Sequence, residues 1–261
     1  MQILVVNDDG ITSPGIWALA GALRDAGLGE VLIVAPEVEQ SGTSMALPPR
    51  RELTLRPVAA PLPAYAGISA YAFNGTPVGC VLVGMQAGLT PRPEVVVTGI
   101  NRGLNSGTNV MLSGTVGAAM LGALWGLPAM AVSQMFTGDA PMPWEIATWA
   151  AIKSFPLLER LRGQGPVVLN VNVPHLHAIA DVRGFRQTSL SSFFYGDVID
   201  VAVEPSPDDA GRNRLTMHFA RERMPAFDEA TDDGAVRAGY ISLTPLTPMG
   251  AAPVKLELGA L

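Results

Sequence analysis

Residues 3–11 read Ile-Leu-Val-Val-Asn-Asp-Asp-Gly-Ile, an apolar run that ends in an amide, two carboxylates and a glycine. A continuous apolar run of this kind is typical of a β-strand that is buried on both faces. A helix is expected next, because Ser13 can cap it, Pro14 suits its first position and apolar residues recur at helical spacing up to Leu23. Together with a second apolar run at 30–35, this segment predicts a strand, a helix and a strand of one parallel sheet.

The same alternation of apolar runs and helical patterns continues downstream. It predicts an α/β fold, namely a three-layer sandwich in which helices cover both faces of a mainly parallel, Rossmann-like sheet. The further elements that we expect are helices at 76–89 and 115–125, and strands at 95–99, 129–133, 167–173 and 240–244.

Two regions depart from this alternation. Residues 47–73 are rich in proline and lack a helical period, so they predict an excursion with extended segments. Residues 185–228 combine adjacent aromatic side chains with a polar turn, which predicts a projecting arm. We expect one domain over 1–261, divided into a core at about 1–184, the arm at about 185–228 and a C-terminal segment at about 229–261.

Composition excludes several classes of protein. The chain has 261 residues, of which 48% are hydrophobic and 15% charged, so it can bury a sizeable core. Its formal net charge of −6 disfavours a nucleic-acid duplex as partner, because binding to phosphate backbones needs a cationic face. The charge-free stretch at 103–138 is interrupted by glycines and a proline, which favours a buried helix over a membrane span. The single cysteine, Cys80, forms no internal disulfide and the first residues show no basic leader, so we expect a cytoplasmic protein without a membrane partner.

Two carboxylates, Asp8 and Asp9, follow the first predicted strand directly. Ligands bind beyond the carboxyl ends of the strands in open parallel sheets, so these side chains are expected at the ligand edge. Adjacent carboxylates repel each other unless a cation lies between them or water reaches both. Hard oxygen donors favour Mg²⁺, Mn²⁺ or Ca²⁺ over zinc. Taken alone, the motif leaves two interpretations open, a divalent-cation site and a solvated Asp-Gly turn.

Further polar groups follow other predicted strands at the same edge. Ser41 lies in the loop after the second strand, where its hydroxyl can bind the cation or belong to a plain connection. Asn101 and Asn105 follow a later strand, and Asn101 can offer a carbonyl oxygen to the same ion. The stretch Ser113-Gly114-Thr115 begins a helix, where free N–H groups and hydroxyls suit a phosphate but also an ordinary N-cap. Because these groups converge, metal-assisted hydrolysis of a phosphate ester is the leading interpretation.

These strand ends, together with motifs elsewhere in the chain, closely resemble the SurE family of stationary-phase survival proteins. The resemblance covers nearly the whole chain in order. Its motifs are Asn7-Asp8-Asp9-Gly10-Ile11, Ser41-Gly42, Gly75-Thr76-Pro77, Thr98-Gly99-Ile100-Asn101-Arg102-Gly103-Leu104-Asn105, Ser113-Gly114-Thr115, Asn170-Val171-Asn172-Val173-Pro174 and Gly239-Tyr240-Ile241-Ser242-Leu243-Thr244-Pro245-Leu246.

The resemblance implies a metal-dependent phosphatase that acts on nucleoside 5′- and 3′-monophosphates and, in some members, on polyphosphate. It implies one divalent cation per subunit, and a homodimer or homotetramer with exchanged C-terminal segments. The arm and the apolar tail at 254–261 offer hydrophobic surface for such an assembly. The site residues that we expect are Asp8, Asp9, Ser41 and Asn101 for the metal, Asp8, Asp9, Asn101 and Ser113 for catalysis, and Asn105, Ser113, Gly114 and Thr115 for the substrate.

The sequence departs from the family pattern at two positions. Many members have an acidic residue or asparagine where Gly79 stands, and many have a histidine where Gly234 stands. The resemblance therefore assigns no residue to protonation of the leaving group. It leaves an alternative function, a metal-dependent nucleotide-binding module without significant turnover.

Overall fold

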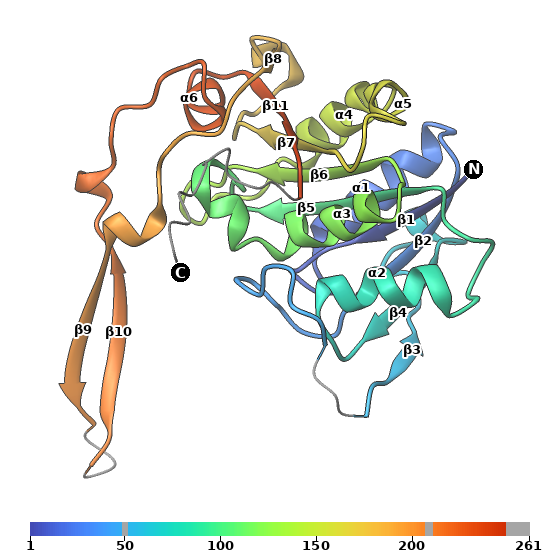
Figure 1. The fold of residues 1–261 in the computed structure, drawn as a ribbon, viewed down its shortest axis with the longest axis horizontal. Coiled ribbons are helices and arrows are strands. Elements are labelled where there is room, and N and C mark those ends of the chain that lie inside the picture. The colour runs from blue at the N-terminus through green and yellow to red at the C-terminus, as the bar shows by residue number, and fades with distance from the viewer. Residues whose placement is uncertain (49–51, 207–210, 249–261) are drawn as a thin grey trace, which may run out of the picture.

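Nine strands form one sheet within the residues that the computed structural model describes, which are 1–48, 52–206 and 211–248 (Figure 1). In spatial order they are β3 (Leu55–Pro57), β4 (Ser69–Phe73), β2 (Glu30–Pro36), β1 (Gln2–Val6), β5 (Val95–Arg102), β6 (Ala129–Gln134), β7 (Val168–Val173), β11 (Ile241–Leu246) and β8 (Phe185–Gln187). The strands from β4 to β7 are parallel to one another, whereas β3 and β11 run antiparallel to β4 and β7. The prediction of a mainly parallel sheet is confirmed.

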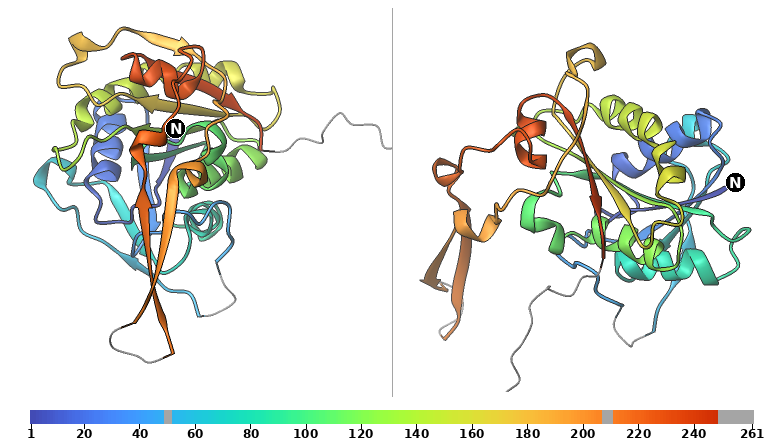
Figure 2. Two further views of the ribbon diagram at one scale, coloured as in Figure 1. Left: turned by 90° about the vertical axis from the view of Figure 1, so that its left-hand side faces the viewer. Right: turned by 45° about the horizontal axis from the view of Figure 1, so that its top comes forward.

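Helices cover both faces of this sheet, as the left view of Figure 2 shows. On one face lie α1 (Pro14–Asp25), α4 (Trp144–Ser154) and α5 (Leu157–Leu161). On the other face lie α2 (Pro77–Gln86) and α3 (Gly114–Leu124), while the short helix α6 (Asp232–Arg237) packs against β11. Short 3-10 helices occur at η1 (Pro63–Tyr65), η2 (Gly107–Met111), η3 (Ile179–Asp181), η4 (Tyr195–Val198) and η5 (Arg221–Arg223).

Strand β1 shows why the apolar run at the start of the chain does not alternate between polar and apolar residues. Ile3 and Val5 point into the core beneath α1 and α4, and Leu4 and Val6 point into the core beneath α2 and α3. Successive side chains of a strand face opposite sides of the sheet, so both faces of β1 must be apolar. All four side chains are 0% exposed, and each fully buried aliphatic side chain stabilises the fold by about 1.5–3 kcal/mol.

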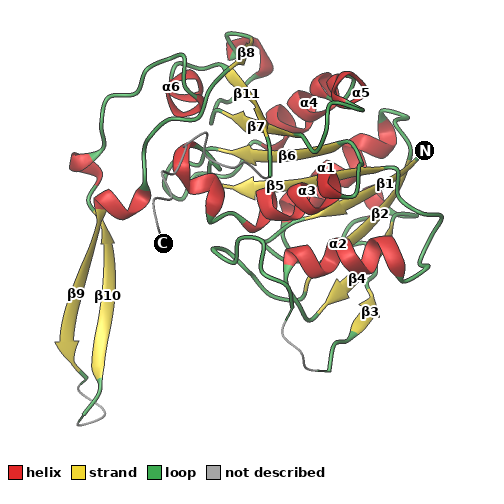
Figure 3. Ribbon diagram, in the orientation of Figure 1, coloured by secondary structure: helices red, strands yellow, loops and turns green. Residues whose placement is uncertain are grey.

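Strand β5 is longer than the predicted strand at 95–99, because it continues to Arg102. Its pairing with β6 shifts in register between Thr98 and Asn101, and Asn101 then pairs with Ser133. The sheet therefore places Asn101 within the strand, not in the loop beyond it. In Figure 3 the arrowheads of β5, β6 and β7 point to one edge of the sheet, where the loops with the candidate residues begin.

A two-stranded hairpin projects from the body of the protein (Figures 1 and 2). It consists of β9 (Ile199–Pro205) and β10 (Asn213–Phe219), which pair with each other and with no strand of the large sheet. It lies inside the arm expected at 185–228, whereas β8, at the start of that range, belongs to the large sheet. The C-terminal segment expected at 229–261 contains α6 and β11, and β11 fills the place between β7 and β8.

No helix in the described part of the chain is long and apolar enough to cross a membrane. The charge-free stretch at 103–138 forms a loop, η2, α3 and β6. The apolar tail at 254–261, which we expected to contribute to assembly, lies outside the described residues.

Candidate active site

The first carboxylate pair lies in a tight turn at the end of β1. Gly10 has a φ of +93°, which favours glycine, and the Asn7 side chain donates a hydrogen bond of 2.9 Å to the Gly10 carbonyl oxygen. The backbone N–H of Ile11 donates to the Pro36 carbonyl oxygen at 2.8 Å, which fixes the turn against the end of β2. The turn therefore holds the intervening Asp8 and Asp9 at the carboxyl edge of the sheet.

Asp8 faces the N-terminus of α3. Its carboxylate is 3% exposed and accepts a hydrogen bond from the Thr115 hydroxyl. A Cβ atom at Gly114 would lie 2.9 Å from the Asp8 Cβ, so a glycine is needed where the helix begins. Burial raises the pKa of Asp8, while hydrogen bonds from Thr115 and Gly114 oppose that effect.

Asp9 is the more strongly perturbed carboxyl of the pair. Burial and the negative charge of Asp8 raise the pKa of Asp9 to about 7, although the backbone of Arg102 opposes the shift. One oxygen of Asp9, Oδ2, is buried without a hydrogen-bond partner, as is Oδ1 of Asn7. A divalent cation would satisfy these buried acceptor oxygens and would neutralise the negative charge of the two aspartates. The donor set thus fits a hard cation.

The loop after β2 packs directly on this turn. The backbone N–H of Gln40 donates to the Asp8 carbonyl oxygen at 2.7 Å. Ser41, the next residue, is exposed and its hydroxyl donates to Glu39 Oε1 at 2.8 Å. Glu39 also contributes to the raised pKa of Asp9. The structure therefore brings Ser41 to the expected edge, and it adds Glu39, which the sequence analysis does not identify.

Asn101 approaches the same edge from β5, the neighbour of β1 in the sheet. Its amide nitrogen donates to the Gly103 carbonyl oxygen at 2.8 Å. That bond engages the nitrogen, so the carbonyl oxygen of Asn101 is the atom suited to a cation. In the described part of the chain no three His, Cys, Asp or Glu residues are grouped to hold a metal. A site here must therefore combine the two aspartates with neutral oxygens.

The helix start at 113–115 is engaged by the protein's own groups. Ser113 Oγ accepts the backbone N–H of Val116 at 3.0 Å, which is the bond of an N-cap. The Thr115 hydroxyl and the first N–H groups of α3 interact with Asp8. The α3 N-terminus therefore stabilises a negative charge in this structure. Phosphate binding by Ser113, Gly114 and Thr115 stays a prediction.

A buried acidic pair that we did not predict holds the loop between β5 and α3. Asp232 accepts the backbone N–H groups of Gly107 and Ser191, each at 2.9 Å. Asp233 accepts the hydroxyls of Ser106 at 2.9 Å and of Ser191 at 2.6 Å. Burial raises the pKa of Asp232, and its backbone hydrogen bonds oppose that effect. The pair ties the loop, α6 and the base of the arm together.

Asn109, in the same loop, is buried and links η2 to the segment that leads into the hairpin. Its amide nitrogen donates to the Phe193 carbonyl oxygen at 3.1 Å, and its oxygen accepts the Tyr195 backbone N–H at 2.8 Å. The Thr108 hydroxyl donates to the same Phe193 oxygen at 2.9 Å. Asn109 therefore fixes the arm and does not point to the carboxylates.

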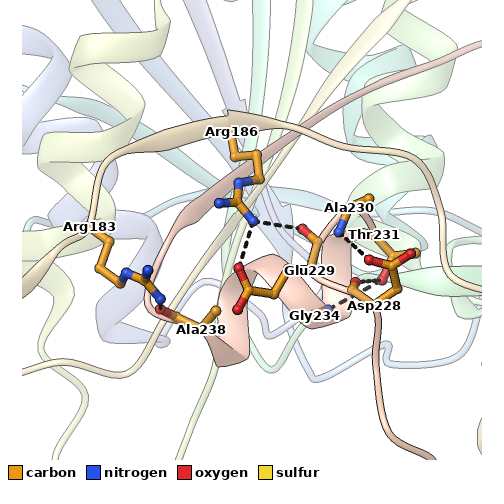
Figure 4. Close-up of polar contacts among 8 residues, drawn as sticks. All are labelled: Arg183, Arg186, Asp228, Glu229, Ala230, Thr231, Gly234 and Ala238. Atoms are coloured by element: carbon orange, nitrogen blue, oxygen red, sulfur yellow. Dashed lines mark hydrogen bonds and ion pairs between the residues drawn. The ribbon is translucent and has the colours of Figure 1, made fainter.

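Gly234 lies in α6 where the chain at Asp228 passes over the helix (Figure 4). A Cβ atom at Gly234 would lie 2.0 Å from the Asp228 carbonyl oxygen, so this backbone leaves no space for a histidine. That oxygen accepts the Thr231 hydroxyl at 2.6 Å, and Arg186 donates to the Glu229 carbonyl oxygen at 3.0 Å. The segment is thus fixed in place, and position 234 provides no general acid.

Two cavities of about 430 and 420 Å³ lie beside α6 and the base of the hairpin. Phe227 lines both, and neither is lined by Asp8 or Asp9. The identification of the active site therefore depends on the chemistry of its donors, not on the size of a cavity.

Comparisons with known proteins give matches over most of the chain. Residues 3–197 match the model of a family described as "Survival protein SurE". The chain is 38% identical to "5'-nucleotidase SurE" of Synechococcus sp. (strain JA-3-3Ab) over 95% of its own length and 92% of that protein. It is also 38% identical to "5'-nucleotidase SurE 1" of Thermus thermophilus, with 95% and 92% covered. The crystal structure of the SurE protein from Aquifex aeolicus superposes with a TM-score of 0.71 at 30% identity, covering 95% and 93% of the two chains.

Proposed function

The chain belongs to the SurE family, and we propose that it is a 5′-nucleotidase, a phosphoric monoester hydrolase that releases phosphate from nucleoside monophosphates. The observation that carries the proposal is the carboxylate pair at the carboxyl edge of the sheet, Asp8 buried and Asp9 half-buried, in a chain 38% identical to named 5′-nucleotidases over 95% of its length. We extend the proposal to 3′-monophosphates and polyphosphate, which share the phosphoryl group that the site must recognise.

The proposal includes one divalent cation per subunit, Mg²⁺ or Mn²⁺, with Ca²⁺ as a further occupant. Asp8 and Asp9 would hold it through carboxylate oxygens, and Ser41 and Asn101 through neutral oxygens. The unpartnered Asp9 Oδ2 and the raised pKa of Asp9 support this assignment. Such an ion supplies Lewis acidity, which neutralises phosphate charge and lowers the pKa of bound water.

The residues around this position have separate roles in the proposal. The Thr115 hydroxyl donates to the Asp8 carboxylate and fixes its orientation. Asn105, Ser113, Gly114 and Thr115 would contact the phosphate ester, because hydroxyls, amides and a helix N-terminus are donors that stabilise its oxygens. Water attacks phosphorus and the nucleoside leaves. Position 234 contributes no proton to that leaving group.

No histidine fits at position 234, so that position supplies no acid for turnover. This observation favours a second candidate, a metal-dependent nucleotide-binding module without significant turnover. Phosphate release from AMP, measured with EDTA and with added Mn²⁺, separates the two functions. Release that requires Mn²⁺ supports the nucleotidase. Tight AMP binding in calorimetry without release supports the binding module.

We also propose a homodimer or homotetramer that forms through the hairpin. Cross-strand pairs Leu215 with Val203, Met217 with Val201 and Phe219 with Ile199 place six apolar side chains on one side, which we call the apolar ribbon face. Met217 is 72% and Leu215 63% exposed in the single chain. An isolated two-stranded hairpin is at best marginally stable in water, so the face requires a partner surface.

The cytoplasm is the proposed location. The single cysteine, Cys80, is free and buried, and burial raises the pKa of its thiol. Such a thiol is protected from oxidation and fits a reducing compartment.

A further inference from the structure

Asn105, in the loop that leads from Asn101 to α3, is bound by side chains of strands β6 and β7. Asn172 Oδ1 accepts the Asn105 backbone N–H at 3.0 Å, and Asn172 Nδ2 donates to the Asn105 carbonyl oxygen at 2.9 Å. Asn170 Nδ2 donates to the same carbonyl oxygen at 2.8 Å. The Asn105 side chain meets Ser133 Oγ at 2.9 Å. Both backbone groups and the side chain of Asn105 are thus held by β6 and β7.

The chemistry of these bonds requires asparagine at both positions of β7. A backbone carbonyl only accepts, so each asparagine must present its N–H₂ group to Asn105. Asn172 must also present an oxygen to the Asn105 N–H, and only an amide offers both atoms in one plane. Asn170 and Asn172 are two residues apart in one strand, which places both on the same face of the sheet.

This arrangement places polar side chains in the core of the sheet. Asn170, Asn172 and Ser133 are each 0% exposed, in strands whose other buried side chains are apolar except for Gln134. Asn170 Oδ1 is buried without a partner, and an unsatisfied buried acceptor is unfavourable. Core packing alone does not account for polar residues that leave such an atom unpaired.

We propose that Asn170, Asn172 and Ser133 are positioning residues that orient the Asn105 side chain toward the phosphate ester. The inference rests on the proposed function and specifies how that site is built. Asn105 Nδ2 donates one hydrogen to Ser133 Oγ, which leaves its second N–H hydrogen for a phosphate oxygen. The β-sheet thereby fixes a group that the loop alone would leave mobile, and misplacement of such a group by about 1 Å slows catalysis about a hundredfold.

The test is a double-mutant cycle between Asn105→Ala and Asn172→Asp. The aspartate has the same shape but sets an oxygen against the Asn105 carbonyl, so it should release the loop. We expect each single variant to lower kcat/KM for AMP with Mn²⁺ between about tenfold and a hundredfold. The double variant should be no slower than Asn105→Ala, because Asn172 acts only through Asn105. Hydrogen exchange should show that the 103–109 backbone amides lose protection in Asn172→Asp.

Two further variants keep the test decisive. Ser133→Ala removes one hydroxyl and should lower kcat/KM about threefold to tenfold, again without added effect in the Asn105→Ala background. Thr188→Val is the matched control, because it deletes a buried hydroxyl bonded to Ser242 and Thr244 at 2.7 Å and touches no part of the loop. It should lower the melting temperature and leave kcat/KM unchanged.

Several results would overturn the inference. One is an unchanged kcat/KM in both Asn172→Asp and Ser133→Ala. Another is a loss of kcat/KM in each double variant that equals the product of the losses in its two single variants. A third is a loss of kcat/KM in Thr188→Val as large as that in Asn172→Asp. A parent protein that does not hydrolyse AMP would instead contradict the proposed function. In that case the same cycle, measured as calorimetric affinity for AMP, decides whether Asn172 positions Asn105.

Discussion

The carboxyl edge of the sheet and the apolar ribbon face of the hairpin are two regions with opposite chemistry. At the edge, Asp9 is half-buried and its Oδ2 atom is buried without a hydrogen-bond partner. On the hairpin, Met217 and Leu215 are apolar and mostly exposed. The first region holds a buried acceptor without a donor, and the second holds an apolar face that is exposed in the single chain. The functions proposed above assign each region a different component outside the single chain, a cation in one case and a second subunit in the other.

The two regions also differ in how they are supported. The edge lies on parallel strands buried on both faces, so its side chains have little freedom. The hairpin pairs only with itself and is tied to the body through Asp232, Asp233 and Asn109. Variants at the edge should change activity with little effect on assembly, whereas variants of the hairpin should change assembly first.

Removal of divalent cations should have the largest effect. EDTA should abolish phosphate release from AMP, and added Mn²⁺ or Mg²⁺ should restore it, because the paired carboxylates need a cation to bind a phosphate dianion. The proposed interface on the hairpin is apolar, so the mass measured by light scattering should stay the same. Full activity after exhaustive chelation would contradict the metal assignment.

Replacement of Asn101 by alanine should reduce kcat/KM for AMP by more than about a hundredfold, since loss even of groups that only support metal ligands costs about tenfold to a hundredfold. Asn109→Ala, in the loop that follows β5, is the matched control. It removes the bonds to Phe193 and Tyr195, so it should destabilise the protein by about 1–3 kcal/mol and affect turnover much less. Equal kinetic losses in the two variants would contradict the assignment of Asn101 as the metal ligand.

Substitution of Met217 by serine should reduce the oligomer, because it places a hydroxyl at the centre of the apolar ribbon face. Size-exclusion chromatography with light scattering measures the change, which we expect as a shift toward a smaller species. Thr216→Ser, on the opposite and polar side of the same strand, is the control and should keep the parental mass. If Met217→Ser keeps the parental mass, the hairpin does not form the subunit interface.

The smallest expected effect is a slight rise in the stability of the metal-free protein in Asp9→Asn. Without metal it removes a charge that Asp8 repels, so the melting temperature should rise by about 2–4 °C for a gain near 1 kcal/mol. Asp139→Asn, an exposed carboxylate, should change nothing. Added Mn²⁺ should stabilise the parent and not the Asp9 variant. A variant that keeps both its activity and its metal-induced shift would exclude Asp9 as a ligand.

The same carboxyl predicts how stability depends on pH in the metal-free protein. The pKa of Asp9 is about 7 in the fold against 3.8 as the ordinary value, so the folded state binds more protons between these limits. Stability must then fall as pH rises through 7. Melting curves with EDTA should show this loss between pH 5 and pH 7 in the parent, and a smaller loss in Asp9→Asn.

Local sequence patterns determined the alternating strands and helices and the polar groups at their ends. The run at 3–6 is apolar at every position because both faces of β1 are covered, and that requirement is visible without a structure. Helix α4 is not among the predicted elements, although Ile146, Ala147, Ala150 and Ala151 recur at helical spacing. Its packing against α1 explains why those small residues are buried.

Only the tertiary structure decided which distant residues complete the site. Asn101 belongs to β5 because pairing with Ser133 extends the strand, and Glu39 reaches Asp9 because two loops pack together. Asp232 and Asp233 meet Ser106 and Ser191 across long separations in the chain. Periodicity reports which face of an element is buried, since burial repeats with the geometry of the strand or helix. It carries no information about which polar groups will satisfy one another, because those partners are set by strand order and loop packing.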